Sequence, residues 1–161
     1  MSDKLDWLSP LELLDDYDGY WAKYVEGIYG IFREDFIDGR THFREQRVGM
    51  KRHPVVRNKE ATFWHLISSG RSEEERLPDL RRCERIRWPK AMIEAAQYGH
   101  VRCWVTERRR EERIVIALPD FSYVVVLAKR GQYLVLWTAY CVEQKHRRLS
   151  LQRECERAQK G

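Results

Sequence analysis

The sequence of 161 residues lacks the short motifs that mark several common classes of enzyme. It has no glycine-rich phosphate loop, no His-Glu-x-x-His motif, and no serine or cysteine arrangement typical of nucleophilic catalysis. Its carboxylates and histidines do not show the spacing of metal ligands. We therefore expect a protein without a metal or other cofactor, and these absences disfavour metal-dependent and nucleotide-dependent enzymes.

Cysteine is scarce and scattered. None of the four cysteines lies in a C-x-x-C pair, which excludes zinc-ribbon and thioredoxin-like sites. They are Cys83, Cys103, Cys141 and Cys155. Because they stand among apolar residues, we expect reduced thiols in the core.

Long apolar runs are also missing. The longest, from Tyr123 to Ala128, is far shorter than a bilayer crossing requires. The first residues, MSDKLDWLSPLELL, lack the basic start and apolar stretch of a signal peptide. The sequence therefore predicts a soluble protein that is cytoplasmic and has no membrane partner.

Charge is abundant and unevenly distributed. The net charge is +5 and the pI is about 9.1. Residues 1–40 hold ten acidic and four basic residues, a net of −6, so the remaining 121 residues carry +11. A basic body of this kind suits a polyanion such as RNA. An acidic helix that neutralises a basic domain for solubility is an equally good interpretation.

The pattern predicts a single domain over 1–161, in which helices precede a sheet. Ser9-Pro10 predicts a helix that runs toward Phe36, within an acidic helical segment 1–40. Its apolar stripe favours a place in the core and comprises Leu11, Leu14, Tyr17, Trp21, Val25 and Ile28. In the basic part, 41–161, we expect an edge strand or loop over Thr41–Arg57, a short helix over Glu60–Ser69, and a helix from Pro78-Asp79. A further helix is expected to start at Pro89 and end near Tyr98.

From Val101 onward the hydrophobic period changes to that of strands. We expect four: Arg102–Glu107, Arg113–Leu118, Ser122–Lys129 and Tyr133–Val142. Short connections make them an antiparallel meander, and a charged helical tail over Gln144–Arg157 follows. The expected fold class is α+β, with N-terminal helices packed on a four-stranded antiparallel sheet. Strict alternation places five residues of the last strand on one face: Leu134, Leu136, Thr138, Tyr140 and Val142.

The stretch from Lys59 to Arg87 carries the candidate chemistry. Phe63, Leu66 and Ile67 share one side of the short helix, and Thr62, His65, Ser68 and Ser69 share the other. Arg81, Arg82 and Arg85 share a face of the helix that follows. A histidine that moves a proton, beside arginines that stabilise a developing negative charge, suits phosphodiester cleavage without a metal. A surface histidine beside solvated arginines explains the same pattern.

Three segments resemble a family of small phage- and prophage-associated proteins. They are ATFWHLIS, RLPDLRRCERIRW and YVVVLAKRGQYLVLWTAYCVEQKHRR. We identify this family as a phage-associated branch of the barnase–EndoU–colicin–RelE (BECR) superfamily of RNase toxins. The resemblance covers roughly residues 40–157 and does not include the N-terminal forty.

The resemblance implies a metal-independent endoribonuclease of the toxin type that cuts cytoplasmic RNA through attack of the ribose 2′-OH. The matching catalytic positions are His65, Arg82, Arg85 and Thr138, with Tyr140 beside Thr138. We expect RNA contacts from the basic residues Lys51, Arg52, Arg81, Lys145, His146 and Arg147. An antitoxin or immunity protein is implied as a partner.

Each candidate also has a structural interpretation. Arg82 and Arg85 can pair with nearby glutamates or with the acidic helix, and Thr138 and Tyr140 are common strand residues. The alternative function is a non-catalytic, basic phage or prophage protein that binds RNA or a host protein. In a third interpretation, the tryptophans form a structural interface.

Overall fold

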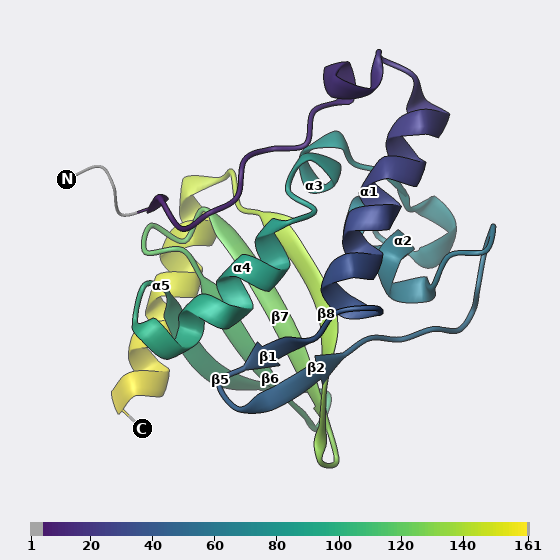
Figure 1. Ribbon diagram of the computed structural model, residues 1–161. Coiled ribbons are helices and arrows are strands. Elements are labelled where there is room, and N and C mark those ends of the chain that lie inside the picture. Colours follow the sequence, from purple (N-terminus) through teal and green to yellow (C-terminus); the bar gives the residue numbers. More distant parts are fainter. Residues whose placement is uncertain (1–4, 161) are drawn as a thin grey trace.

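The computed structural model describes residues 5–160, with only the backbone of Glu73, and is organised around one mixed sheet (Figure 1). The strand order in this sheet is β1-β2-β8-β7-β6-β5. The strands are β1 (Thr41–Phe43), β2 (Gln46–Gly49), β5 (Arg102–Arg108), β6 (Glu111–Ala117), β7 (Tyr123–Arg130) and β8 (Tyr133–Cys141). A separate small ladder joins β3 (Ser68–Ser69) to β4 (Leu77–Pro78).

The expected α+β class and the meander of β5 to β8 are confirmed. The expectation of a four-stranded, purely antiparallel sheet is wrong, because β1 and β2 extend it to six strands. β2 lies parallel to β8, and the paired residues are Val48 with Leu134 and Gly49 with Val135. Burial of Val48 and Leu134, 1% and 2% exposed, stabilises a contact between segments 86 residues apart in the chain.

The predicted helix over Ser9–Phe36 is correct only in its second half. The helix α1 spans Trp21–Phe36, whereas the preceding chain is irregular apart from the 3-10 turn η2 (Leu14–Tyr17). Asp18 and Gly19 have φ values of 60° and 73°, a left-handed pair that no helix can continue through. Leu11 and Trp21, expected in the buried stripe, are exposed.

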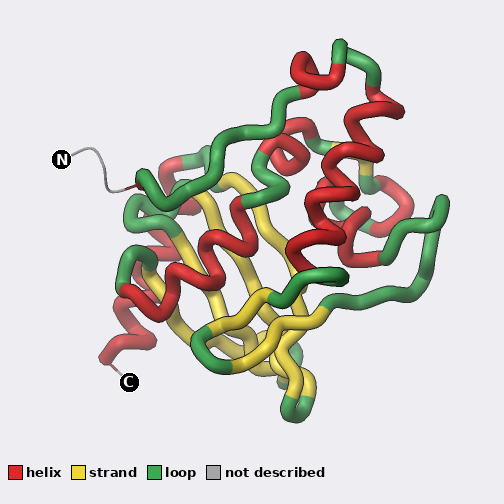
Figure 2. The backbone as a smooth tube through the Cα atoms, viewed as in Figure 1, coloured by secondary structure: helices red, strands yellow, loops and turns green. Residues whose placement is uncertain are grey.

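The other helices follow the predicted order. They are α2 (Ala61–Ile67), α3 (Leu80–Glu84), α4 (Trp88–Ala95) and α5 (Lys145–Lys160), with the short 3-10 turns η3 (Glu73–Glu75) and η4 (Ala96–Tyr98). Asp79 caps α3 by accepting from the backbone N–H of Arg81 at 3.1 Å. The loop from β2 to α2 runs along the side of the molecule (Figure 2).

The helices cover both faces of the sheet (Figure 1). The larger core lies between one face and α1, α2, α3 and α4; it includes Tyr24, Phe32, Phe63, Met92 and Leu127. The smaller core lies under α5 and includes Trp104, Phe121, Val124, Val126 and Cys155. The predicted C-terminal helical tail is therefore a covering layer of the sheet.

A β-bulge in β8 overturns the predicted alternation of that strand. Val126 pairs with Thr138 while Leu127 pairs with Leu136, so Trp137 is the extra residue. Leu134 and Leu136 consequently belong to the larger core, and Val142 and Tyr140 lie on the α5 side. The extra residue shifts the pleat, so the five side chains predicted to share a face are divided between two.

The remaining general expectations concern thiols and membranes. All four cysteines are free; Cys83 and Cys155 are buried and the other two are half-buried. Among residues 5–160 we find no helix with both the length and the apolar character that a bilayer crossing requires.

Candidate functional site

His65 lies on the wall of a cavity of about 690 Å³ between α2, the loop before it and the bulged part of β8. Its lining combines basic, aromatic and apolar groups: Lys51, Pro54, Val56, Arg57, Ala61, Thr62, Trp64, His65, Ser68, Arg76, Pro78, Leu136 and Trp137. Ligand cavities of several hundred Å³ are typical of small-molecule and substrate sites. This cavity is therefore our candidate site.

The apolar face of α2 fixes the helix against the core. Phe63, Leu66 and Ile67 are all at most 3% exposed, as their spacing predicted, which turns His65 toward the cavity. Thr62 and Ser68 were expected on the polar side with His65, but both are buried. Burial of the Thr62 hydroxyl is tolerated because it accepts from the backbone N–H of Lys51 at 2.7 Å.

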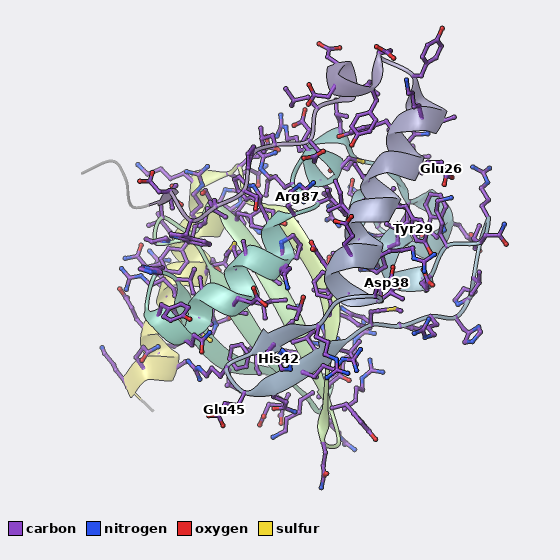
Figure 3. The ribbon with its side chains drawn as sticks, viewed as in Figure 1. Glu26, Tyr29, Asp38, His42, Glu45 and Arg87 are labelled. Carbon is purple, nitrogen blue, oxygen red and sulfur yellow. The ribbon has the colours of Figure 1, made fainter. Side chains whose placement is uncertain are left out.

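The loop over 50–60 is tied to both α2 and α1. The backbone N–H groups of Ala61 and Thr62 donate to the carbonyls of Arg52 and Lys51, both at 3.0 Å. Trp64 donates from its indole to the carbonyl of Val56 at 2.9 Å. The side of α1 that carries Glu26 and Tyr29 faces this loop (Figure 3), where Glu26 pairs with Lys59 and Tyr29 donates to Glu60. The basic wall of the cavity is thus held in a defined place.

The backbone of His65 is held by two arginines. Arg76 and Arg82 donate to its carbonyl oxygen at 3.0 and 3.3 Å, and Arg76 also donates to the carbonyl of Ser68. Cations are favourable at this position because a helix C-terminus presents unpaired carbonyls and partial negative charge. The Nε of Arg76 is buried and has no hydrogen-bond partner within the described part of the chain.

The imidazole of His65 lies beside the extra residue of the bulge. Its ring centroid is 5.8 Å from that of Trp137, at an interplanar angle of 44°. Arg113 and Arg130 approach the same indole at 4.9 and 5.5 Å, and both pair with Glu111. The bulge therefore brings one aromatic ring close to both the histidine and an arginine pair.

The predicted catalytic arginines have different surroundings from those the sequence suggested. The guanidinium of Arg82 is half-buried, and this burial, together with nearby Arg76, lowers its pKa. It holds the backbone of His65 and does not line the candidate cavity. Arg85 lies farther away, where it donates to the carbonyl of Arg81 at 3.1 Å and stacks over Trp88 at 5.0 Å.

The predicted hydroxyls lie on the α5 side of the sheet. Thr138 pairs with Val126 of the smaller core, and Tyr140 packs against that core. Burial raises the pKa of Tyr140. Arg82 approaches the Tyr140 ring at 5.9 Å, but neither hydroxyl residue lines the His65 cavity. The bulge is the physical reason, since it moves both residues to the opposite face.

The residues predicted to bind RNA form two groups. Lys51 lines the cavity, and Arg52 beside it pairs with Glu60 at 3.7 Å. Arg81 pairs with Glu143, and the exposed Lys145, His146 and Arg147 follow in the first turn of α5. Only the first group borders His65.

Three charged or aromatic lining residues carried no functional prediction, namely Trp64, Arg76 and Trp137, whereas Arg57 was expected as part of a basic segment, Thr41–Arg57, that could contact phosphate. Arg57 carried a weak signal, because Arg57-Asn58 suits a tight turn; both residues have positive φ, 52° and 64°. No sequence signal pointed to Trp137 or Arg76. The bulge at Trp137 and the contact of Arg76 with the end of α2 both depend on partners that are distant in the chain.

The side chains of the described residues include no group of three histidine, cysteine or carboxylate residues placed to hold a metal ion. The chain matches no protein-family model, no curated protein and no solved structure to which it was compared.

Proposed function

We propose that the protein is an endoribonuclease that cleaves cytoplasmic RNA through attack of the ribose 2′-OH on the adjacent phosphate, without a catalytic metal. The observation that carries this proposal is the shared cavity of His65, Lys51 and Arg57. Imidazole titrates near neutral pH and can move the proton of the attacking or leaving oxygen.

Two cations in the cavity have no competing carboxylate. Lys51 and Arg57 are exposed, and neither side chain makes an ion pair within the part of the chain that the structure describes. They are therefore available to a phosphate and to the additional charge of the transition state. The left-handed backbone of Arg57 costs on the order of 1 kcal/mol, and strain of this kind is common where a side chain serves a site.

The roles of the other residues differ in this proposal from those implied by the resemblance. Arg76 and Arg82 act as positioning residues because they hold the carbonyl of His65. Arg85 and Thr138 take no part in the proposed reaction.

Cleavage of total RNA in EDTA tests the proposal. His65→Gln should reduce the rate at least about 100-fold, the usual contribution of one proton-transfer group. His42→Gln is the matched control, since His42 lies on the edge strand β1, away from α2 (Figure 3). Products should carry a 2′,3′-cyclic phosphate. Products with 3′-hydroxyl ends, or activity that EDTA abolishes, would contradict the mechanism.

RNA binding has a separate matched pair of variants. Arg57→Gly and Arg44→Gly each remove one exposed arginine with positive φ, but only Arg57 lines the cavity. We expect Arg57→Gly to weaken binding about 10-fold and Arg44→Gly to leave it nearly unchanged. Wild-type binding should fall steeply between 50 and 200 mM salt, as expected for phosphate contacts.

A second candidate function is RNA binding without cleavage. It is favoured by the engagement of Arg82 with the backbone of His65 and by the position of Arg85 and Thr138 outside the cavity. Wild-type protein that binds RNA and leaves it intact would establish this candidate and reject the first.

We infer that the nuclease is a toxin and has an inhibitor protein, because uncontrolled RNA cleavage harms the cell that makes it. Expression of the wild type should then arrest growth, as should expression of His42→Gln. His65→Gln should be harmless at equal protein level. Harmless wild-type expression from a protein that is active when purified would refute the toxin role.

A further inference from the structure

A second cavity, of about 430 Å³, lies between the N-terminal segment, the end of α1 and the helices α4 and η4. The segment is fixed there: the carbonyl of Ser9 accepts from the Trp88 indole at 2.9 Å, and Glu12 pairs with Arg87 at 3.0 Å. Its key lining residues are Trp7, Asp35, Arg87, Lys90, Tyr98 and His100. None of these residues lines the His65 cavity.

Asp35 is the unexplained group in this cavity. It is 9% exposed, and its carboxylate makes no hydrogen bond or ion pair among the described residues. The carboxylate lines the cavity and has no protein donor among the described residues, so a ligand with donors can satisfy it there in place of solvent. Two acceptor oxygens suit a planar group that presents two adjacent N–H donors.

The cations beside Asp35 differ in availability. Lys90 uses its donors on Glu94 at 3.1 Å, the carbonyl of Arg40 at 3.3 Å and the hydroxyl of Thr41 at 3.5 Å. Among the described residues, Arg87 donates only from its Nε, to Glu12, so its terminal N–H groups are available to a ligand. The cavity thus offers a paired acceptor and a paired donor.

Aromatic rings complete the lining. The rings of Trp7 and His100 are stacked, with centroids 6.1 Å apart and planes 20° apart, and Tyr98 approaches His100 at 6.2 Å. Such rings are typical surfaces for planar bases. The cavity volume lies in the range for small-molecule sites.

We propose that this cavity binds a guanine base, with Asp35 accepting from the N1–H and 2-amino groups and Arg87 donating to O6 or N7. Guanine carries the two adjacent donors on one edge and two acceptors on another, and arginine is a common partner of those acceptors. Adenine presents an acceptor where guanine has its N1–H, so the carboxylate disfavours it. The inference does not depend on the proposed nuclease activity.

Titration calorimetry of the full chain with GMP, IMP and AMP at pH 7.5 tests the proposal. IMP lacks the 2-amino group and should bind about 10-fold more weakly than GMP, and AMP should bind more weakly still. Equal binding of the three nucleotides would overturn the inference.

Asp35→Asn should weaken GMP binding at least 10-fold, because an amide offers only one acceptor. Asp38→Asn is the control: it makes the same charge change at an exposed carboxylate that pairs with Arg33, outside the cavity. Thermal unfolding of both variants verifies that they are folded. Retained GMP affinity in a folded Asp35→Asn protein would overturn the proposal.

The guanine could belong to a free nucleotide or to unpaired RNA. A uridine pentamer with one added guanosine, compared with a uridine hexamer, separates these sources. Binding of GMP indicates the free nucleotide, whereas guanosine-dependent binding of the oligonucleotide alone indicates RNA. Failure of both probes to bind the wild type would overturn the inference.

Discussion

The two faces of the sheet are covered in different ways. On one face, α1, α2, α3 and α4 enclose the larger core, and both cavities described above lie on that side. On the other, α5 alone covers a smaller core that includes Trp104 and Val124. Several short elements packed together leave recesses of about 690 and 430 Å³ between them, whereas Tyr140 borders a recess of only about 240 Å³. The difference explains why the α5 face carries Thr138 and Tyr140 but no candidate site.

Removing α1 from the first face should destabilise the protein more than any single substitution. A chain that starts at Gly39 lacks α1, whose buried residues include Tyr24, Ile28 and Phe32. We expect it to show no cooperative unfolding transition by circular dichroism, since this burial is a large part of the core. A folded truncation would show that α1 is dispensable and that the rest of the larger core is sufficient for folding.

Single substitutions compare the two cores directly. Phe32→Ala should lower the free energy of unfolding by about 3–5 kcal/mol, because Phe32 is 1% exposed. Leu151→Ala in α5 should cost about 1 kcal/mol, because Leu151 is only half-buried. Urea unfolding measures both values. Similar losses would contradict the unequal roles of the two faces.

Asp35→Asn should raise stability. Burial raises the pKa of Asp35 to about 6, against the lowering influence of Lys90 and Arg87, with Glu34 and Glu94 also nearby. The folded state thus binds the Asp35 proton more tightly than the unfolded state does. The stability that this proton provides to the folded state is lost as pH rises through 6. Asparagine does not titrate, so the variant should gain at most about 3 kcal/mol over the wild type at pH 7.5.

At pH 4 the Asp35→Asn variant and the wild type should have nearly the same free energy of unfolding. Most of the folded wild-type protein has a neutral Asp35 side chain at that pH. Unfolding in urea at the two pH values measures the change. A stability difference that does not depend on pH would show that the carboxylate is ionised throughout.

A modest loss is expected from removing the bulge in β8. Deleting Trp137 removes the extra residue, so Leu136 and Thr138 keep their present faces in a regular strand. We expect a loss of only about 1–2 kcal/mol from the lost cation–π and aromatic contacts. Deleting Val125 from the regular centre of β7 is the comparison, and it should prevent folding because it shifts buried residues out of register. Equal damage from the two deletions would contradict the assignment of the bulge.

Much of the order of elements was predictable because it depends on local patterns. The alternation after Val101 predicted the meander, and Phe63, Leu66 and Ile67 predicted the buried face of α2. The candidate site was predictable only in part: His65 and Lys51 border one cavity, but Arg85 and Thr138 do not. Helical spacing gives the face on which a side chain lies but not which distant group it meets.

Local sequence patterns were sufficient to predict the α+β class, the antiparallel order of β5 to β8 and the helical tail, since these follow from hydrophobic period and turn residues within short windows. Three features could be seen only in the folded chain: β2 joins β8 in parallel, α1 begins at Trp21, and Trp137 is an extra residue in its strand. The physical reason is that each of these depends on contacts between distant segments. Burial of Val48 against Leu134, for example, is favourable only when the whole sheet is assembled.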